Sequence, residues 1–146
     1  MPTGDRSFPA QDALTVLLQA LPALAAWHVD YGIPLDRSEL ECWVDEQVIT
    51  ERTEVTSGLV CYDEKFTLHI WLYAKKTGAT ALEIRTEVDA AKVAIEAAIT
   101  ADPSLGGVVM QAVITGTEFD SGIADAEARS RDAALTIDIG CSAFVG

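Results

Sequence analysis

The two histidines of this chain are the side chains most able to act as a general base. His69 could do so with Asp63 or Glu64 nearby in the sequence. It lies in the middle of an alternating segment, however, with Trp71 on the same face, and this pattern is more typical of a histidine on a sheet face or at an interface. The other histidine, His28, has no better candidate partners, so neither predicts a catalytic site.

A group of acids forms the second candidate. Glu39, Glu41 and Asp45 are separated by even numbers of residues and are expected to share one strand face. Carboxylates two residues apart on a strand lie about 7 Å from each other, which could suit a hydrolase pair or a loosely held cation. No second cluster of identifiable ligands accompanies them. We therefore interpret these acids as a solvated face or as an acidic surface lining a channel.

The cysteines and the sequence motifs add no chemistry. Cys42, Cys61 and Cys141 are scattered in apolar segments with no CxxC pair and no zinc-ligand spacing, which predicts buried thiols. The sequence contains no glycine-rich phosphate loop, HExxH or GxSxG motif. We expect no catalytic residues, no metal and no cofactor, and hence a protein that is not an enzyme.

The composition is that of one soluble domain, residues 1–146, with 49% hydrophobic and 23% charged residues. No apolar run reaches the roughly 18 to 20 residues that span a bilayer, and the N-terminus does not resemble a secretion signal, so we expect no membrane partner and synthesis in the cytoplasm. The net charge of −13 argues against ordinary nucleic-acid binding. An acidic wall would nevertheless let DNA slide past without sticking.

The segment from residue 61 to 99 carries the strongest structural signals. Lys65–Tyr73 alternates apolar residues with Thr67, His69, Trp71 and Tyr73, which predicts a strand with one face on a core. Thr80 and Glu83 then form a capping box. A helix of about five turns should follow. Its predicted buried stripe is Ile84, Val88, Ala91, Ile95 and Ile99.

The rest of the chain completes an α+β prediction. We expect a flexible segment 1–7, a helix over 8–22 capped by Ser7, a short strand 27–31, a long strand 40–53, a hairpin 51–58, a strand 108–119, an exposed loop at about 118–130 and a closing strand 131–145. The order is α-β-β-β-α-β-β. Two helices should pack on one face of a mainly antiparallel or mixed sheet of about five strands.

Two helices suffice for only one face of such a sheet. The other face is predicted to carry Trp43, His69, Trp71 and Tyr73, which are too apolar for plain solvent. An exposed aromatic patch typically marks an association surface. We therefore expect the protein to associate with copies of itself through these residues.

The order of elements resembles a known family. A helix, the strands ELECWVDEQVI and KFTLHIWLYAK, the helix TALEIRTEVDAAKVAIEAAI, the turn DPSLGG, the strand VVMQAVITGTEF and the strand AALTIDIGCSAF follow one another. Over residues 8–145 this arrangement resembles the tail terminator (tail completion) proteins of long-tailed bacteriophages.

That resemblance implies a structural role in the virion. Such proteins form a ring, usually hexameric, that caps the tail tube, ends its polymerisation and offers a head–tail joining surface to the connector, while phage DNA passes through without specific binding. The location implied is the virion at the head–tail junction, after assembly in the host cytoplasm. The family has no catalytic residues to transfer.

The resemblance also assigns a role to the expected loop at 118–130. Its acidic residues are the predicted contacts with tail-tube or connector protein: Glu118, Asp120, Asp125 and Glu127. Two alternatives stay open. One is a head-side neck or connector adaptor, and the other is a small ligand-binding α+β regulatory domain whose dimer buries Trp71.

Overall fold

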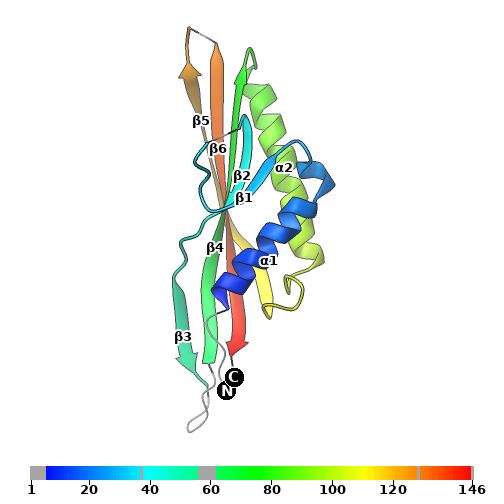
Figure 1. The fold of residues 1–146 in the computed structure, drawn as a ribbon, viewed down its shortest axis with the longest axis vertical. Helices are drawn as coiled ribbons and strands as arrows, with labels where there is room; N and C mark the ends of the chain where they lie inside the picture. The colour runs from blue at the N-terminus through cyan, green and yellow to red at the C-terminus, as the bar shows by residue number, and fades with distance from the viewer. Residues whose placement is uncertain (1–5, 37, 56–61, 128, 146) are drawn as a thin grey trace.

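The computed structural model describes residues 6–36, 38–55, 62–127 and 129–145. They form two α-helices, one 3₁₀ turn and a six-stranded sheet (Figure 1). The elements in order are α1 (Ser7–Ala20), η1 (Pro22–Leu24), β1 (His28–Tyr31), β2 (Leu40–Val44), β3 (Thr50–Glu54), β4 (Tyr62–Thr77), α2 (Ala81–Ala101), β5 (Gln111–Asp125) and β6 (Ser130–Val145).

The centre of the sheet is the antiparallel ladder between β4 and β6. It runs without a break from Tyr62 opposite Val145 to Thr77 opposite Ser130. Side chains alternate strictly between the two faces, so the even-numbered residues of β4 from 64 to 74 are buried and the odd-numbered ones are not. The alternation predicted for Lys65–Tyr73 is therefore confirmed, and β6 alternates in the same way.

The sheet order is β1-β2-β4-β6-β5, and β3 pairs with the same edge of β4 as β2 does. β1 and β2 are parallel and the other pairs are antiparallel. Both helices lie on one side of the sheet (Figure 1). The α+β class and the mixed sheet are confirmed, with six strands instead of about five and the order α-β-β-β-β-α-β-β.

The second helix forms as its sequence predicts. The Thr80 hydroxyl accepts a hydrogen bond from the Glu83 N–H, and the Glu83 carboxylate accepts one from the Thr80 N–H, so the capping box is complete. All five residues of the predicted apolar stripe are buried against the sheet. Neither of the helices in the described ranges is long and apolar enough to cross a membrane.

The first helix begins differently from the prediction. Ser7 is not its cap but its first, buried residue, and the N-cap position is Arg6, whose side chain makes no capping bond. The Arg6 N–H instead donates to the buried Glu64 carboxylate at 3.0 Å, so a strand side chain satisfies this helix end. Pro22 starts the 3₁₀ turn after the helix, as expected of a helix-ending proline. Residues 1–5 of the predicted flexible segment lie outside the described residues.

The predicted long strand 40–53 is two strands. β2 pairs with the 70–74 end of β4 and β3 with its 62–66 end. Between them the Asp45 carboxylate accepts a hydrogen bond from the Gln47 N–H at 3.0 Å, a local turn that takes the chain out of the ladder. Of the predicted hairpin 51–58, residues 51–54 belong to β3, and the stretch 56–58 is outside the described residues.

The predicted exposed loop at about 118–130 is mostly strand. β5 continues to Asp125 and returns through a short turn into β6. Glycine, serine and aspartate at 120–125 predicted a loop, but backbone pairing with the long β6 does not depend on those side chains. Register shifts between Ile114 and Gly116 and between Ile123 and Asp125 let the ladder accommodate the irregular sequence.

The two faces of α2 provide a matched stability test. Ile95→Ala removes a side chain that is 0% exposed, and we expect it to lower the free energy of unfolding by about 2 to 5 kcal/mol. Val93→Ala alters a side chain that is 55% exposed on the same helix and should change it by less than about 0.5 kcal/mol. Urea denaturation followed by circular dichroism measures both. Equal effects of the two substitutions would contradict the described packing.

Candidate association surface

The sheet face opposite the helices carries an aromatic patch, which we define as Trp43, Trp71 and Tyr73. Trp43 of β2 lies directly opposite Trp71 of β4 in the ladder. Their rings stack with centroids 5.9 Å apart and planes 7° from parallel. A hollow of about 400 Å³ lies beside the patch, between Ile33 and the residues that follow β2. The predicted grouping of these aromatics on one face is therefore observed.

The members of the aromatic patch differ in burial. Trp43 is only 5% exposed within the single chain, although it lies on the face away from the helices. Trp71 and Tyr73 are half-buried. Trp43 thus contributes mainly to the stability of the chain, and the surface left for a partner comes from Trp71 and Tyr73.

An acidic patch continues the same face on the neighbouring strands. We define it as Glu118, Asp120, Asp132 and Asp138. Glu118 lies opposite Thr136, which in turn lies opposite Trp71, so aromatic and acidic side chains sit on one face at the same level of the sheet. Glu118 and Asp120 are exposed. The face is therefore aromatic on β2 and β4 and acidic on β5 and β6.

Two side-chain contacts tie β4 to the acidic patch, and the second of them connects the two patches. His69 and Asp138 are ladder partners, and His69 Nδ1 lies 2.6 Å from Asp138 Oδ1. The Tyr73 hydroxyl donates to Asp132 Oδ2 at 3.5 Å. Glu64, one possible catalytic partner of His69, points to the opposite face, where it is fully buried.

The other possible catalytic partner, Asp63, is no better placed. It lies six residues along the strand from His69, or about 20 Å at the rise of a β-strand. The described geometry therefore makes His69 part of a surface hydrogen bond and places neither carboxylate where a general base would need it.

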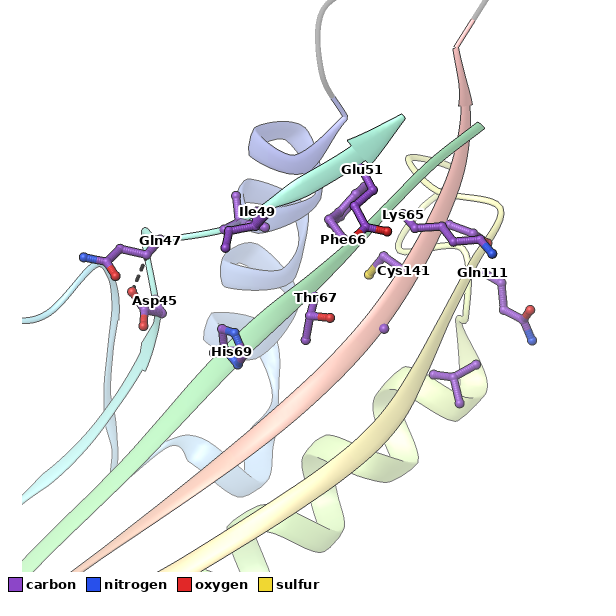
Figure 2. A pocket seen from close by; sticks show the side chains of 14 residues that line it. Asp45, Gln47, Ile49, Glu51, Lys65, Phe66, Thr67, His69, Gln111 and Cys141 are labelled. Atoms are coloured by element: carbon purple, nitrogen blue, oxygen red, sulfur yellow. Dashed lines mark hydrogen bonds between the residues drawn. The ribbon is translucent and has the colours of Figure 1, made fainter. Parts of the chain in front are cut away.

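An open groove of about 780 Å³ crosses this face next to His69 (Figure 2). Asp45, Gln47 and Ile49 form one wall on the connection between β2 and β3, and Figure 2 shows Thr67 and His69 on its floor. Gly140 lies on this floor as well. A Cβ there would come within 2.9 Å of Thr115 Cγ2, so a larger residue at this position would force the Thr115 side chain on the bulged β5 strand to shift.

The predicted acidic strand face of Glu39, Glu41 and Asp45 is only partly exposed to solvent. Glu39 is exposed and Asp45 is half-buried, but Glu41 is 0% exposed, so its assignment to a solvated face was wrong. The parallel strand β1 lies beside Glu41 and brings His28 and Asp30 close to it. Local sequence patterns did not reveal this cluster, because it depends on pairing between two separate strands.

The acidic residues at the end of the β5–β6 hairpin remain accessible. Asp125 ends β5, Glu127 lies in the turn, and both are exposed. The Glu127 N–H donates to the Asp125 carboxylate at 3.0 Å, which orders the turn. These residues, with Glu118 and Asp120, lie on an ordered hairpin and not on a long loop.

Two of the cysteines are buried, as predicted. Burial raises the pKa of the Cys42 thiol to about 12 and that of Cys141 to about 12. Both thiols therefore stay protonated at neutral pH and pack as small apolar groups. Cys61 is outside the described residues.

Comparison with known proteins shows only a weak similarity of fold to the solved structure named below. No protein-family model matches the chain, and no curated protein sequence matches it. A chain of the virion of a native gene transfer agent (GTA) particle is 14% identical over 90% of this chain and 93% of that chain, with a TM-score of 0.46. At this identity and TM-score, the similarity identifies neither a family nor a function.

The hydrogen bond between His69 and Asp138 should contribute little to the stability of the chain. Their side chains are 37% and 42% exposed, and exposed ion pairs contribute about 0.2 to 1 kcal/mol. A double-mutant cycle with His69→Gln and Asp138→Asn, measured by urea denaturation at pH 6, should give a coupling free energy in that range. A coupling free energy above about 2 kcal/mol would contradict this expectation and show that the pair contributes substantially to the stability of the fold.

Proposed function

We propose that this protein is a structural component of a phage virion that forms a ring, caps the tail tube, ends its polymerisation and supplies the head–tail joining surface. The observation that carries the proposal is the sheet face away from the helices, with its aromatic patch on one half and its acidic patch on the other. The order of elements that resembles the tail terminator family supports the same function.

A closed ring requires a heterologous interface, in which two different surfaces of each subunit meet. The outer face offers two chemically different patches. The sheet also ends on one side in β5, a long strand whose one ladder partner among the described strands is β6. Such an edge can accept a neighbouring chain, and the aromatic patch supplies apolar area for the contact.

The charge of the chain fits a channel through which DNA passes. A ring of chains that each carry −13 repels phosphate and does not grip the DNA. We propose that the exposed acids Asp125 and Glu127 at the hairpin end contact tail-tube or connector protein. No catalytic step is part of the proposed function.

Analytical ultracentrifugation and negative-stain electron microscopy, with and without the tail-tube protein of the same phage, test the proposal. We expect closed rings at one end of tubes of limited length. Trp71→Ala should raise the protein concentration needed for half-maximal ring formation by at least about tenfold. We expect this because aromatic residues contribute most of the binding free energy at interfaces. Trp71 is preferred over Trp43 for this test because Trp43 is already buried in the single chain.

The matched control is Val93→Ala on the helix side of the sheet, which should leave ring formation unchanged. A protein that stays monomeric with both tube and connector present would contradict the proposal. Binding to the connector alone, with no effect on the tube, would indicate a head-side neck adaptor instead. A twofold dimer with a small-molecule thermal shift would indicate a regulatory domain.

A further inference from the structure

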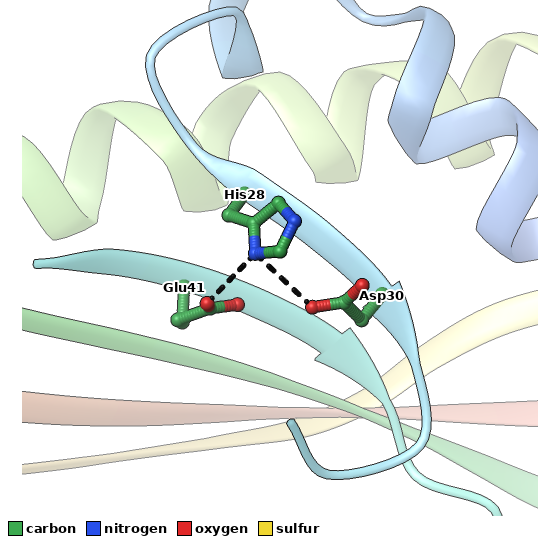
Figure 3. Close-up of side chains that lie close together, drawn as sticks. All are labelled: His28, Asp30 and Glu41. Carbon is green, nitrogen blue, oxygen red and sulfur yellow. Dashed lines mark hydrogen bonds and ion pairs between the residues drawn. The ribbon is translucent and has the colours of Figure 1, made fainter. Parts of the chain in front are cut away.

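A cluster of potential metal ligands lies at the β1–β2 edge of the sheet, next to the aromatic patch on the same face, with Asp30 opposite Trp43 and Glu41 opposite Tyr73 (Figure 3). His28 lies directly opposite Glu41 in the parallel pair, and Asp30 follows two residues later on the same strand face. One ligand atom from each of the three side chains lies within 4.8 Å of the other two. His28 Nδ1 is 2.9 Å from Glu41 Oε1 and 3.3 Å from Asp30 Oδ2.

The burial of Glu41 is the independent observation that points to a ligand. Its side chain is 0% exposed, and its Oε1 accepts hydrogen bonds from the Ser38 N–H at 3.0 Å and from His28. Its other oxygen, Oε2, is buried and has no hydrogen-bond partner among the residues that the structure describes. Figure 3 shows that this second oxygen lies on the side of Asp30. A buried carboxylate oxygen without a partner costs free energy, which a bound cation would recover.

The charge and geometry of the cluster suit a divalent ion of the zinc type. Two carboxylates beside one neutral imidazole leave two negative charges, which one divalent cation balances. Ligands around tetrahedral zinc, with bonds of about 2.0 Å, are about 3.3 Å apart, and this is the separation of His28 Nδ1 and Asp30 Oδ2. His28 Nδ1 lies closer to Glu41 Oε1, at 2.9 Å, because it donates a hydrogen bond there, and it would lose that proton to solvent on binding the ion. The His28 side chain is 59% exposed, so water can reach the site as a further ligand. An imidazole ligand disfavours calcium and magnesium.

We propose that His28, Asp30 and Glu41 form a binding site for one Zn²⁺ ion. The ligands come from both β1 and β2, so the bound ion fastens the short edge strand to the sheet. The site is independent of the proposed function, and its test is separate from ring formation.

The competing occupant is a proton. The hydrogen bond to Glu41 and the charges of Asp30 and Glu41 raise the pKa of His28 above its ordinary value, which favours a protonated imidazole between the two carboxylates. A hydrogen-bonded triad of this kind would make the same short contacts without a metal. The two possibilities differ in whether the untagged protein takes up zinc at a single site.

Isothermal titration calorimetry with ZnCl₂ tests the site. The titration uses untagged full-length protein at pH 7.5 in excess MgCl₂, after treatment with EDTA and removal of the EDTA. We expect one Zn²⁺ per chain. Asp30→Asn and His28→Gln should each weaken binding by at least about tenfold to 100-fold. Zinc should also raise the melting temperature of the natural protein but not that of Asp30→Asn.

The matched control is His69→Gln. It removes the other histidine, which pairs with a single carboxylate, and should leave zinc affinity unchanged. Asp30 is used in preference to the buried Glu41, because its substitution leaves the strand pairing intact. The proposal is overturned if the natural protein binds no zinc beside magnesium, if Asp30→Asn binds as tightly as the natural protein, or if His69→Gln loses as much affinity as His28→Gln.

Discussion

The unbroken ladder between β4 and β6 is the constraint on which the rest of the structure depends. Because side chains of paired strands alternate with period two, the ladder assigns every residue of two long strands to one face or the other. The inward set, with Leu68, Ile70, Ile137 and Ile139 at its centre, forms a core that both helices cover. A shift of one residue would exchange the two sets, so the apolar core fixes the composition of the outer face as well.

The outer face is ordered within the single chain. Trp43 stacks on Trp71, His69 pairs with Asp138, and the Tyr73 hydroxyl reaches Asp132. These contacts hold the aromatic patch, with Asp132 and Asp138 of the acidic patch, in place before any partner arrives. A surface that is ordered in advance loses less conformational entropy on association. This order supports the proposal that the face is built for assembly.

Sequence reasoning succeeded where local signals and tertiary packing agree. The capping box at Thr80 and the stripe ending at Ile99 specify α2 without reference to the rest of the chain. The alternation in β4 likewise identified its inward and outward residues. Tertiary pairing determined what the sequence did not reveal: backbone bonds to β6 extend β5 to Asp125, and the parallel neighbour β1 buries Glu41.

One missed feature had a local signal. Asp45 two residues before Gln47 is a turn-forming arrangement, and it ends β2 where a continuous strand was predicted. The cluster of His28, Asp30 and Glu41 had no such signal. Its members lie on two strands, β1 and β2, that are separated in the sequence. The parallel pairing of such short strands produces no periodic pattern in the sequence.

The most direct test of the central claim is a cryo-electron microscopy reconstruction of the protein assembled on tail tubes. We expect a neighbouring copy to cover the outer sheet face in every subunit, with Trp71 and Tyr73 buried at the contact. A reconstruction in which that face is open to solvent in every copy, and the subunits meet through the helices instead, would contradict it.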